Sequence, residues 1–512
     1  MKRYIWILIA AFFLLLVGSG LVISPFYGDI NVIDEGQFGG WITHMLHGQK
    51  LYVDTYAAYG PLYIYPLYFA SKLFGPSVFL IRIIYLVIGT LGALIIAKWA
   101  MQRLKIKEYI QYMVLSLLII IPGFGMRQGM GLIALLALDK GIAKNNPKWW
   151  MITGATVCIT FLVSSDMGIF VGIISALSVF IASIHAEKLK SVLINTAGYL
   201  VGIVVPFLIF SILAYQDGWL TAYIQTVVDD YISYSGMGLP NGQAFPNLLT
   251  LFFEANSPWA MVKVILSREA ILYWNYLLYF CLVAFIVIKF LLKGRLVDTY
   301  LSFITIFGFM LSMILLGRFG HIPFVIPISF ILMGYLCSRV LLLPKGKLKI
   351  VIIVAMVIFS LRFVSLYRPH FGRILEIPSN FFQNTASASY IGPISISREQ
   401  DEQFLFVQKF VHENVEKNES IFFLGNEPVM YLVANRTNPS RFDLPEVINS
   451  KAKRYELIES LEKKETKYIL YNKSSWDVDG VSNAQRLPEL MEYIGQKYTS
   501  SEQQGFVIYK RR

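Results

Sequence analysis

Long apolar stretches constrain this chain more than any other feature. A helix needs roughly 20 apolar residues to cross the hydrocarbon core of a bilayer. The chain of 512 residues is 56% hydrophobic with a mean hydropathy of +0.56, which is more apolar surface than a soluble fold of this length hides. About eleven suitable stretches lie near 4–23, 77–100, 108–124, 126–140, 149–165, 168–184, 191–214, 271–290, 298–316, 322–342 and 349–366. We therefore predict a polytopic α-helical membrane protein with about eleven transmembrane helices.

The distribution of positive charge predicts the topology. The net charge is +12, and Lys and Arg residues gather on every second connection, at 2–3, 98–107, 140–148, 188–190, 289–295 and 339–349. Connections rich in Lys and Arg stay in the cytoplasm. The N-terminus is then cytoplasmic, and the external segments are 24–76, 122–127, the turn at Asp166, 215–270, 317–321 and everything after about 367. The charge thus indicates membrane orientation, and no nucleic-acid partner is expected.

Several function classes are disfavoured by what the sequence lacks. It has no Walker loop, no glycine-rich dinucleotide fingerprint and no cysteine pair with zinc spacing, so ATP hydrolysis is not expected. The three cysteines, Cys158, Cys281 and Cys337, lie in predicted spans and form no planned set of external disulfides. The first stretch follows Lys2 and Arg3 without a small-residue cleavage site, which predicts an uncleaved anchor.

Composition divides the chain into three parts. Residues 1–367 form the transmembrane module with external loops 24–76 and 215–270, residues 368–398 are linker-like, and residues 399–512 are predicted to form an extracytoplasmic α/β domain. In the last part we expect helices near 399–416, 449–464 and 487–497, with strands at 421–425, 467–471 and 506–510. Residues 35–74 are aromatic and interrupted by proline, which favours short interfacial helices. The segment 215–270 is expected to be a lid or binding loop.

The first external segment resembles that of the C-type membrane glycosyltransferases, in particular the bacterial group related to protein O-mannosyltransferases and aminoarabinose transferases. The shared features are the acidic pair Asp34 and Glu35, a helix ending in HGQKLYVD, and GPLYIYPLYFASKLFGPS leading to Arg82. The resemblance is most specific over about residues 30–90 and weaker around 315–330 and in the terminal domain. It implies a sugar donor on polyprenyl phosphate, an aspartate as catalytic base, and a transfer that inverts the anomeric centre. Metal dependence varies within that group, so a divalent metal ion is an open possibility.

The polar residues predicted to face outward include side chains that such a transfer requires. The acceptor must lose a proton while phosphate departs, which needs one base and positive charge on the departing oxygens. Candidate catalytic residues are Asp34 and Glu35, and candidate donor-phosphate ligands are Arg82, Arg127, Arg318 and His321. Asp166, Tyr56 and Tyr59 are candidates for contacting the acceptor or a metal ion. His44 and His47, on one helical face, could also bind metal together with Glu35.

Each assignment has a structural alternative. Asp34 and Glu35 could only cap the helix that follows, since acids are stabilised at helix N-termini. Arg82 could merely reach outward to the interface instead of contacting phosphate or the acidic pair, and Arg127 could anchor a short outer turn. Asp166 could serve turn formation, and the two histidines could form amphipathic surface. Arg318 and His321 lie where two spans meet, ahead of two prolines, and polar groups at such breaks often line a cavity.

We therefore expect a glycosyltransferase of a bacterial inner membrane, with Asp34 as general base and an unidentified lipid, glycan or protein acceptor. One alternative is a transporter or flippase of lipid-linked glycans, which would show paired charges at mid-membrane and repeated halves. The other is a non-catalytic envelope protein whose terminal domain binds a partner. The enzyme places Asp34 at the floor of a cavity, whereas the binding protein places it as a shallow, capped acid.

Overall fold

The computed structural model describes residues 25–120, 125–184, 189–236, 256–265, 267–293, 298–314, 326–342, 385–477 and 481–512, with the single residues 254, 346 and 350. The chain forms two compact units. Unit 1 contains residues 1–24, 85–209 and 241–377, and unit 2 contains residues 25–84, 210–240 and 378–512. Each unit is described below by itself.

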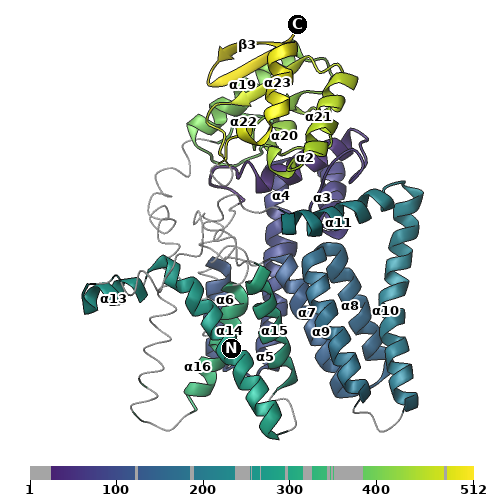
Figure 1. Cartoon of the computed structure of the whole chain (residues 1–512), viewed down its shortest axis with the longest axis vertical. Helices are drawn as coiled ribbons and strands as arrows, with labels where there is room; N and C mark the ends of the chain where they lie inside the picture. Colours follow the sequence, from purple (N-terminus) through teal and green to yellow (C-terminus); the bar gives the residue numbers. More distant parts are fainter. Residues whose placement is uncertain are drawn as a thin grey trace. The chain divides into compact units, whose positions relative to one another are not determined.

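Unit 1 is a bundle of apolar helices, coloured from purple-blue at α5 to green at α16 in Figure 1. Its described elements are η1 (Tyr85–Leu91, a π-helix), α5 (Gly92–Arg103), α6 (Glu108–Ile120), α7 (Met126–Lys144), α8 (Pro147–Val163), α9 (Ser165–Ile184), most of α10 (Leu189–Gln216), α13 (Pro258–Ile265), α14 (Arg268–Lys293), α15 (Thr299–Ile314) and α16 (Ile326–Val340). Helix α7 packs against α5, α8, α9 and α15, so it occupies the centre of the bundle.

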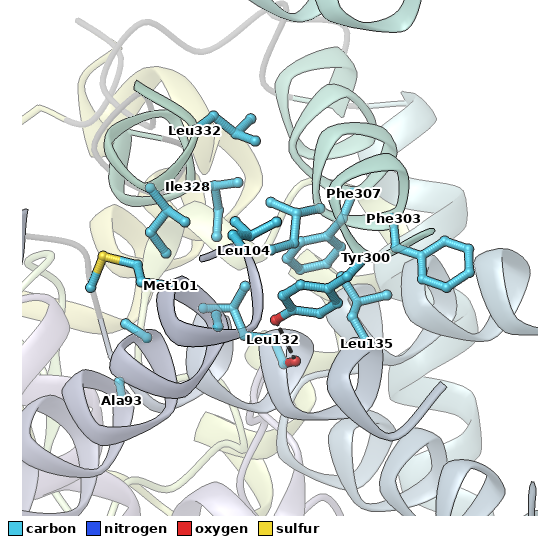
Figure 2. Close-up of a cluster of buried hydrophobic side chains, with 14 of the residues drawn as sticks. Ala93, Met101, Leu104, Leu132, Leu135, Tyr300, Phe303, Phe307, Ile328 and Leu332 are labelled. Carbon is cyan, nitrogen blue, oxygen red and sulfur yellow. Dashed lines mark hydrogen bonds between the residues drawn. The ribbon is translucent and has the colours of Figure 1, made fainter. Parts of the chain in front are cut away.

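The core of unit 1 combines aliphatic and aromatic side chains with close helix approaches. Figure 2 shows Tyr300, Phe303 and Phe307 of α15 beside Leu132 and Leu135 of α7. The Tyr300 hydroxyl donates to the Leu132 carbonyl oxygen at 3.4 Å, which satisfies a polar group inside this core.

Glycines permit two of these helices to approach closely. A Cβ atom on Gly154 of α8 would lie 2.1 Å from the Tyr199 carbonyl oxygen of α10, and one on Gly202 would lie 2.1 Å from the Met151 carbonyl oxygen. Small residues at such crossings are typical of helix packing in membranes.

The predicted spans coincide with helices wherever the structure describes them. Nine of the eleven stretches overlap a helix, the stretch at 4–23 lies outside the described residues, and the stretch at 349–366 does so except for residue 350. Within the described part, two helices are long and apolar enough to cross a membrane, Val78–Arg103 and Lys190–Gln216, and six shorter helices are also apolar. The number of eleven transmembrane helices therefore stays a prediction.

Unit 2 joins an N-terminal segment to an α/β region around a four-stranded sheet. Its elements are α2 (Asp34–Leu46), α3 (Pro61–Phe74), α4 (Val78–Ile84), α11 (Leu220–Gly236), α19 (Arg398–Asn414), β1 (Phe422–Phe423), α20 (Val429–Ala434), η3 (Pro445–Val447, a 3₁₀-helix), α21 (Lys451–Lys463), β2 (Tyr468–Asn472), α22 (Asn483–Arg486), α23 (Pro488–Lys497), β3 (Tyr498–Gln503) and β4 (Phe506–Arg511). The strand order is β1-β2-β4-β3, with β1 and β2 parallel and the other pairs antiparallel.

Three glycines bring α2 against α20. A Cβ atom on Gly36 would lie 2.6 Å from the Val429 backbone nitrogen, one on Gly39 would lie 3.0 Å from the Leu432 side chain, and one on Gly40 would lie 3.3 Å from the Pro428 carbonyl oxygen. Larger side chains at these positions would push the two helices apart. The glycine spacing in the first external segment thus sets a tight contact with a helix almost 400 residues further along the chain.

The elements expected near the C-terminus occur in the structure at nearly the expected positions. The helices at 399–416, 449–464 and 487–497 correspond to α19, α21 and α23, and the strands at 421–425, 467–471 and 506–510 correspond to β1, β2 and β4. The prediction missed α20 and β3 because each is short or polar. Residues 378–512 belong to the same compact unit as residues 25–84, and the boundaries of the predicted domains stay a prediction.

The two segments 35–74 and 215–270, which were predicted to lie outside the membrane, both contain helices. Two short helices, α2 and α3, occupy the aromatic stretch at 35–74. The segment 215–270 was expected to be a loop, but residues 220–236 form α11 and residues 258–265 form α13. In unit 2, α11 is held by aromatic packing, since the rings of Tyr223 and Tyr52 lie 4.9 Å apart and those of Trp219 and Tyr52 lie 5.5 Å apart.

A buried carboxyl group lies at the carboxyl end of the parallel strand pair. Glu427 follows β1, is 7% exposed, and accepts hydrogen bonds from the Asn472 Nδ2 atom at the end of β2 at 2.9 and 3.1 Å. Burial raises the pKa of Glu427 to about 7, and the hydrogen bond from Asn472 opposes that rise. The folded protein therefore holds a proton on this group at pH values where the unfolded chain has released it.

Stability should fall as the pH rises through the range in which Glu427 ionises in the folded protein. Its contribution is fully present below about pH 4.5, declines between pH 4.5 and 7, and is lost above pH 7. The loss amounts to about 3 kcal/mol, since each pKa unit is worth about 1.4 kcal/mol. We expect Glu427→Gln to remove this slope from the free energy of unfolding measured against pH. The control is Glu459→Gln on exposed α21 surface, which should leave the slope intact; equal slopes in wild type and Glu427→Gln would contradict the prediction.

Candidate functional site

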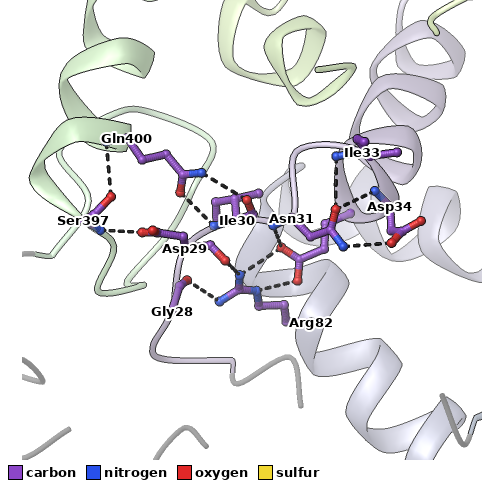
Figure 3. Close-up of polar contacts among 10 residues, drawn as sticks. Gly28, Asp29, Ile30, Asn31, Ile33, Asp34, Arg82, Ser397 and Gln400 are labelled. Atoms are coloured by element: carbon purple, nitrogen blue, oxygen red, sulfur yellow. Dashed lines mark hydrogen bonds and ion pairs between the residues drawn. The ribbon is translucent and has the colours of Figure 1, made fainter. Parts of the chain in front are cut away.

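The first turn of α2 presents one carboxylate to solvent. Asp34 is exposed, and its Oδ2 atom accepts a hydrogen bond from Asn31 Nδ2 at 2.8 Å. Asn31 Oδ1 in turn accepts from the backbone N–H groups of Ile33 at 3.2 Å and Asp34 at 2.9 Å. Figure 3 shows this turn, with Asn31 and Asp34 facing one another. The network orients the Asp34 carboxylate at a helix N-terminus, where negative charge is favoured.

The second carboxylate of the pair is buried and bound by an arginine. Glu35 is 3% exposed and Arg82 of α4 is 2% exposed. Arg82 Nε and Nη2 donate to the two Glu35 carboxylate oxygens, both at 2.9 Å, so the contact is bidentate. Burial raises the pKa of the Glu35 carboxyl, and the guanidinium of Arg82 opposes that rise. The sequence left the partner of Arg82 open, and in the structure Arg82 contacts the acidic pair through Glu35.

The same guanidinium also ties down the chain that precedes α2. Arg82 Nη1 donates to the Gly28 carbonyl oxygen at 3.2 Å, and Nη2 donates to the Asp29 carbonyl oxygen at 3.1 Å. Asp29 Oδ1 accepts from the Ser397 backbone at 2.6 Å, and Gln400 exchanges two hydrogen bonds with the backbone of Ile30 (Figure 3). Residues 28–30, which precede Asp34, are thus held by Arg82 on one side and by Ser397 and Gln400 on the other.

Arg127 and Asp166 are brought together inside unit 1. Arg127 Nη2 donates to Asp166 Oδ2 at 2.5 Å, and Arg127 Nε donates to Ser164 Oγ at 2.9 Å. Ser164 Oγ donates to Asp166 Oδ1, which also accepts from the Met167 backbone at 2.8 Å. The pair therefore links the start of α7 to the turn between α8 and α9. Roles for Arg127 in binding phosphate and for Asp166 in binding acceptor stay predictions.

The two candidate tyrosines lie in aromatic surroundings in unit 2. Tyr56 is 7% exposed, its backbone N–H donates to the Arg441 carbonyl oxygen at 2.7 Å, and its ring lies 6.0 Å from that of Phe442. Tyr59 stacks on Tyr63 with ring centres 5.2 Å apart. Both residues shape the surroundings of α2, and direct contact with an acceptor stays a prediction.

The sequence did not reveal a buried polar cluster on α2. His44 Nε2 lies 2.9 Å from Asp443 Oδ1, and the two side chains are 0% and 3% exposed. Asn438 Nδ2 donates to the same Asp443 oxygen at 2.9 Å. His44 and Asp443 are 399 residues apart, so only folding places them together. The alternation of apolar and polar residues in SRFDLPEV gave no signal for this contact.

The proposed metal ligands on α2 each have another partner. His44 pairs with Asp443, His47 Nδ1 lies 2.9 Å from the Thr43 carbonyl oxygen, and Glu35 binds Arg82. The hypothesis that these three residues form a metal site is therefore not supported by their arrangement. Over the described ranges as a whole, no group of three His, Cys, Asp or Glu side chains is placed to hold a metal ion. Arg318 and His321 fall outside the part of the chain that the structure describes.

Comparison with known proteins gave matches among solved structures. Neither the family models nor the curated proteins gave a match. The archaeal oligosaccharyltransferase AglB from Archaeoglobus fulgidus, in complex with an inhibitory peptide and a dolichol-phosphate, aligns at a TM-score of 0.45 and 12% identity, over 100% of this chain and 74% of that one. ArnT from Cupriavidus metallidurans aligns at 0.44 and 10% identity in the apo state, over 99% and 97% of the two chains. Bound to undecaprenyl phosphate, ArnT aligns at 0.41 and 11% identity, over 99% and 98%.

These structural neighbours are C-type membrane glycosyltransferases, the group that the first external segment resembles. At such TM-scores the similarity assigns no activity to this chain. The chemistry must therefore be argued from the residues of unit 1 and unit 2 themselves.

Removing Arg82 should destabilise the protein strongly, because it leaves the Glu35 carboxylate buried without its cation. Breaking a buried ion pair from one side costs about 3–5 kcal/mol. We expect Arg82→Met to lower the free energy of unfolding in detergent by that amount, and Glu35→Gln in the same chain to restore part of the loss. The matched control is the exposed pair Arg398–Glu402, where Arg398→Met should cost less than about 1 kcal/mol. Similar losses at Arg82 and Arg398 would contradict a structural role for the buried pair.

Proposed function

We propose that this protein is an integral membrane glycosyltransferase that moves a sugar from a polyprenyl-phosphate donor to an extracytoplasmic acceptor. The observation that carries the proposal is that the two carboxylates of the acidic pair have different environments. Glu35 is neutralised by Arg82 inside unit 2, whereas the adjacent Asp34 carboxylate is exposed and oriented. The resemblance of residues 30–90 to the C-type glycosyltransferases points to the same aspartate.

The chemistry requires one base. The acceptor hydroxyl or amine attacks the anomeric carbon, the bond from that carbon to the phosphate oxygen breaks, and polyprenyl phosphate leaves with the electron pair. The acceptor proton passes to the Asp34 carboxylate. Attack from the face opposite the leaving group inverts the anomeric centre. A positioned general base contributes about 10²–10⁴-fold to such a transfer.

The other residues have distinct parts in this proposal. Arg82 holds Glu35 and the backbone of residues 28–29, and so acts as a positioning residue for Asp34. From the sequence, Arg318 and His321 stay the proposed source of positive charge for the leaving phosphate. Arg127 is bonded to Asp166 within unit 1. No step of the proposal uses a metal ion. The site faces outward from a bacterial inner membrane, with the N-terminus in the cytoplasm.

A second candidate is a non-catalytic envelope protein that binds a partner. The observation in its favour is that Asp34 is exposed rather than at the floor of a cavity, where the enzyme was expected to place it. Asn31 bonds both its backbone and its carboxylate, as in a capping network. A capping acid contributes to helix stability and needs no substrate. The two candidates make opposite predictions for substitutions that keep the cap and change the charge.

The Asp34→Asn substitution should reduce transfer at least about 100-fold, because an amide cannot accept the proton while it can still bond Asn31. The assay is transfer of labelled sugar from a polyprenyl phosphate donor in native membranes. The control is Asp54→Asn in the same external segment, where an exposed aspartate accepts a hydrogen bond from the Lys50 backbone at 2.8 Å. That variant should stay within about twofold of wild type. Full activity of Asp34→Asn would remove Asp34 from the base role and favour the binding protein.

A further inference from the structure

A small cavity in unit 2 lies between α2 and the segment that follows α20. It is lined by Gln37 and Trp41 of α2, Tyr56 and Ala58 of the next segment, and Asp443 with its neighbour Leu444. Ala58 is exposed and Gln37 is half-buried, so the cavity opens at the surface of the unit. Its volume of about 10 Å³ corresponds to one water-sized group. It can therefore accept a single functional group rather than a whole sugar or peptide.

The carboxylate in this cavity is incompletely bonded. Asp443 is 4% exposed, and its Oδ1 atom lies 2.9 Å from His44 Nε2 and accepts from Asn438 Nδ2 at 2.9 Å. Among the residues that the structure describes, the buried Oδ2 atom has no hydrogen-bond partner. Leaving a buried acceptor without a donor is costly. The site is thus complementary to a group that donates a hydrogen bond.

A glycine lies directly beside this oxygen. A Cβ atom on Gly40 would lie 3.2 Å from Asp443 Oδ2, and so would occupy space beside it. The indole of Trp41 and the ring of Tyr56 supply apolar walls. At Tyr56, Lys453 Nζ lies 5.2 Å from the ring centre and donates to the Val447 carbonyl oxygen at 3.3 Å.

We propose that this cavity is a subsite for the acceptor, in which Asp443 Oδ2 accepts a hydrogen bond from a hydroxyl or a protonated amine of the acceptor. The inference rests on the proposed function and adds the acceptor's anchoring group to it. Asp34, Gln37 and Trp41 follow one another at spacings of three and four, so they lie on one face of α2. An acceptor held at Asp443 is therefore aligned along the helix face whose first residue is the general base.

Binding is measured on the full-length protein in lipid nanodiscs without any sugar donor. The probes are glucose, glucosamine and methylammonium, titrated while the intrinsic tryptophan fluorescence and the thermal midpoint are followed. Binding of glucose and glucosamine assigns the subsite to a hydroxyl, and binding of glucosamine and methylammonium without glucose assigns it to an amine. Failure of all three probes to bind would overturn the subsite and leave the cavity to a water molecule.

Two matched glycine variants test the location. Gly40→Ala fills the space beside Asp443 Oδ2 and should raise the probe's Kd at least about tenfold. Gly39→Ala, the neighbouring position, also presses on α20, but the three nearest atoms to its Cβ all belong to Leu432, at 3.0 Å and beyond. It therefore controls for displacement of α20 and should leave the Kd within about twofold of wild type. Asp443→Asn should weaken binding like Gly40→Ala; if it fails to fold, the glycine pair decides. Equal effects of Gly39→Ala and Gly40→Ala would overturn the location.

The outcome is separable from that of the proposed function. Asp34→Asn should bind the probes like wild type because it changes the base and not the cavity. Probe binding without any transfer by wild type counts against the glycosyltransferase alone. Transfer by wild type together with unchanged transfer and acceptor KM in Gly40→Ala counts against the subsite alone.

Discussion

The bidentate contact between Glu35 and Arg82 is the interaction on which the arrangement of unit 2 depends. One guanidinium satisfies a buried carboxylate and two backbone carbonyl groups, and so joins α4, α2 and the chain entering α2. A charge buried this deeply is tolerated only when its partner is equally fixed. The neighbouring Asp34 inherits a defined position without being buried itself. A rigid support beneath an accessible carboxylate is what a catalytic base requires.

Helix α2 contacts both α20 and the cavity, because different faces of the helix make these contacts. Its glycines allow α20 to approach, its buried His44 bonds Asp443, and its polar positions face the small cavity. The contact between His44 and Asp443 joins residues 399 positions apart in the sequence while remaining inside one compact unit. The geometry of the acidic pair and the geometry of the cavity are therefore set by the same thirteen-residue helix.

The sequence predicted local elements well and long-range partners poorly. Apolar length located the helices of unit 1, and alternating patterns located α19, β2 and β4, because each signal is contained in a short window. The contact of Arg82 with the acidic pair was one of three possibilities, beside phosphate and the interface, since a charged residue in an apolar run must find a partner or reach the interface. Asp443 could not be found this way, because nothing local distinguishes it from a turn residue. The helix α11 was taken for loop because glycine and proline in the same segment outweighed its apolar spacing.

The bridge between Asp29 and Ser397 has a consequence for biogenesis. The bonds that fix the chain before α2 come from residues 397 and 400, which leave the ribosome hundreds of residues later. These bonds therefore form only after the intervening residues have been synthesised. Closure of so long a loop costs conformational entropy, although this cost grows only slowly with loop length. Unit 2 is thus completed last, and a chain truncated before residue 397 would lack the hydrogen bonds to Asp29 and Ile30 that fix the chain before α2.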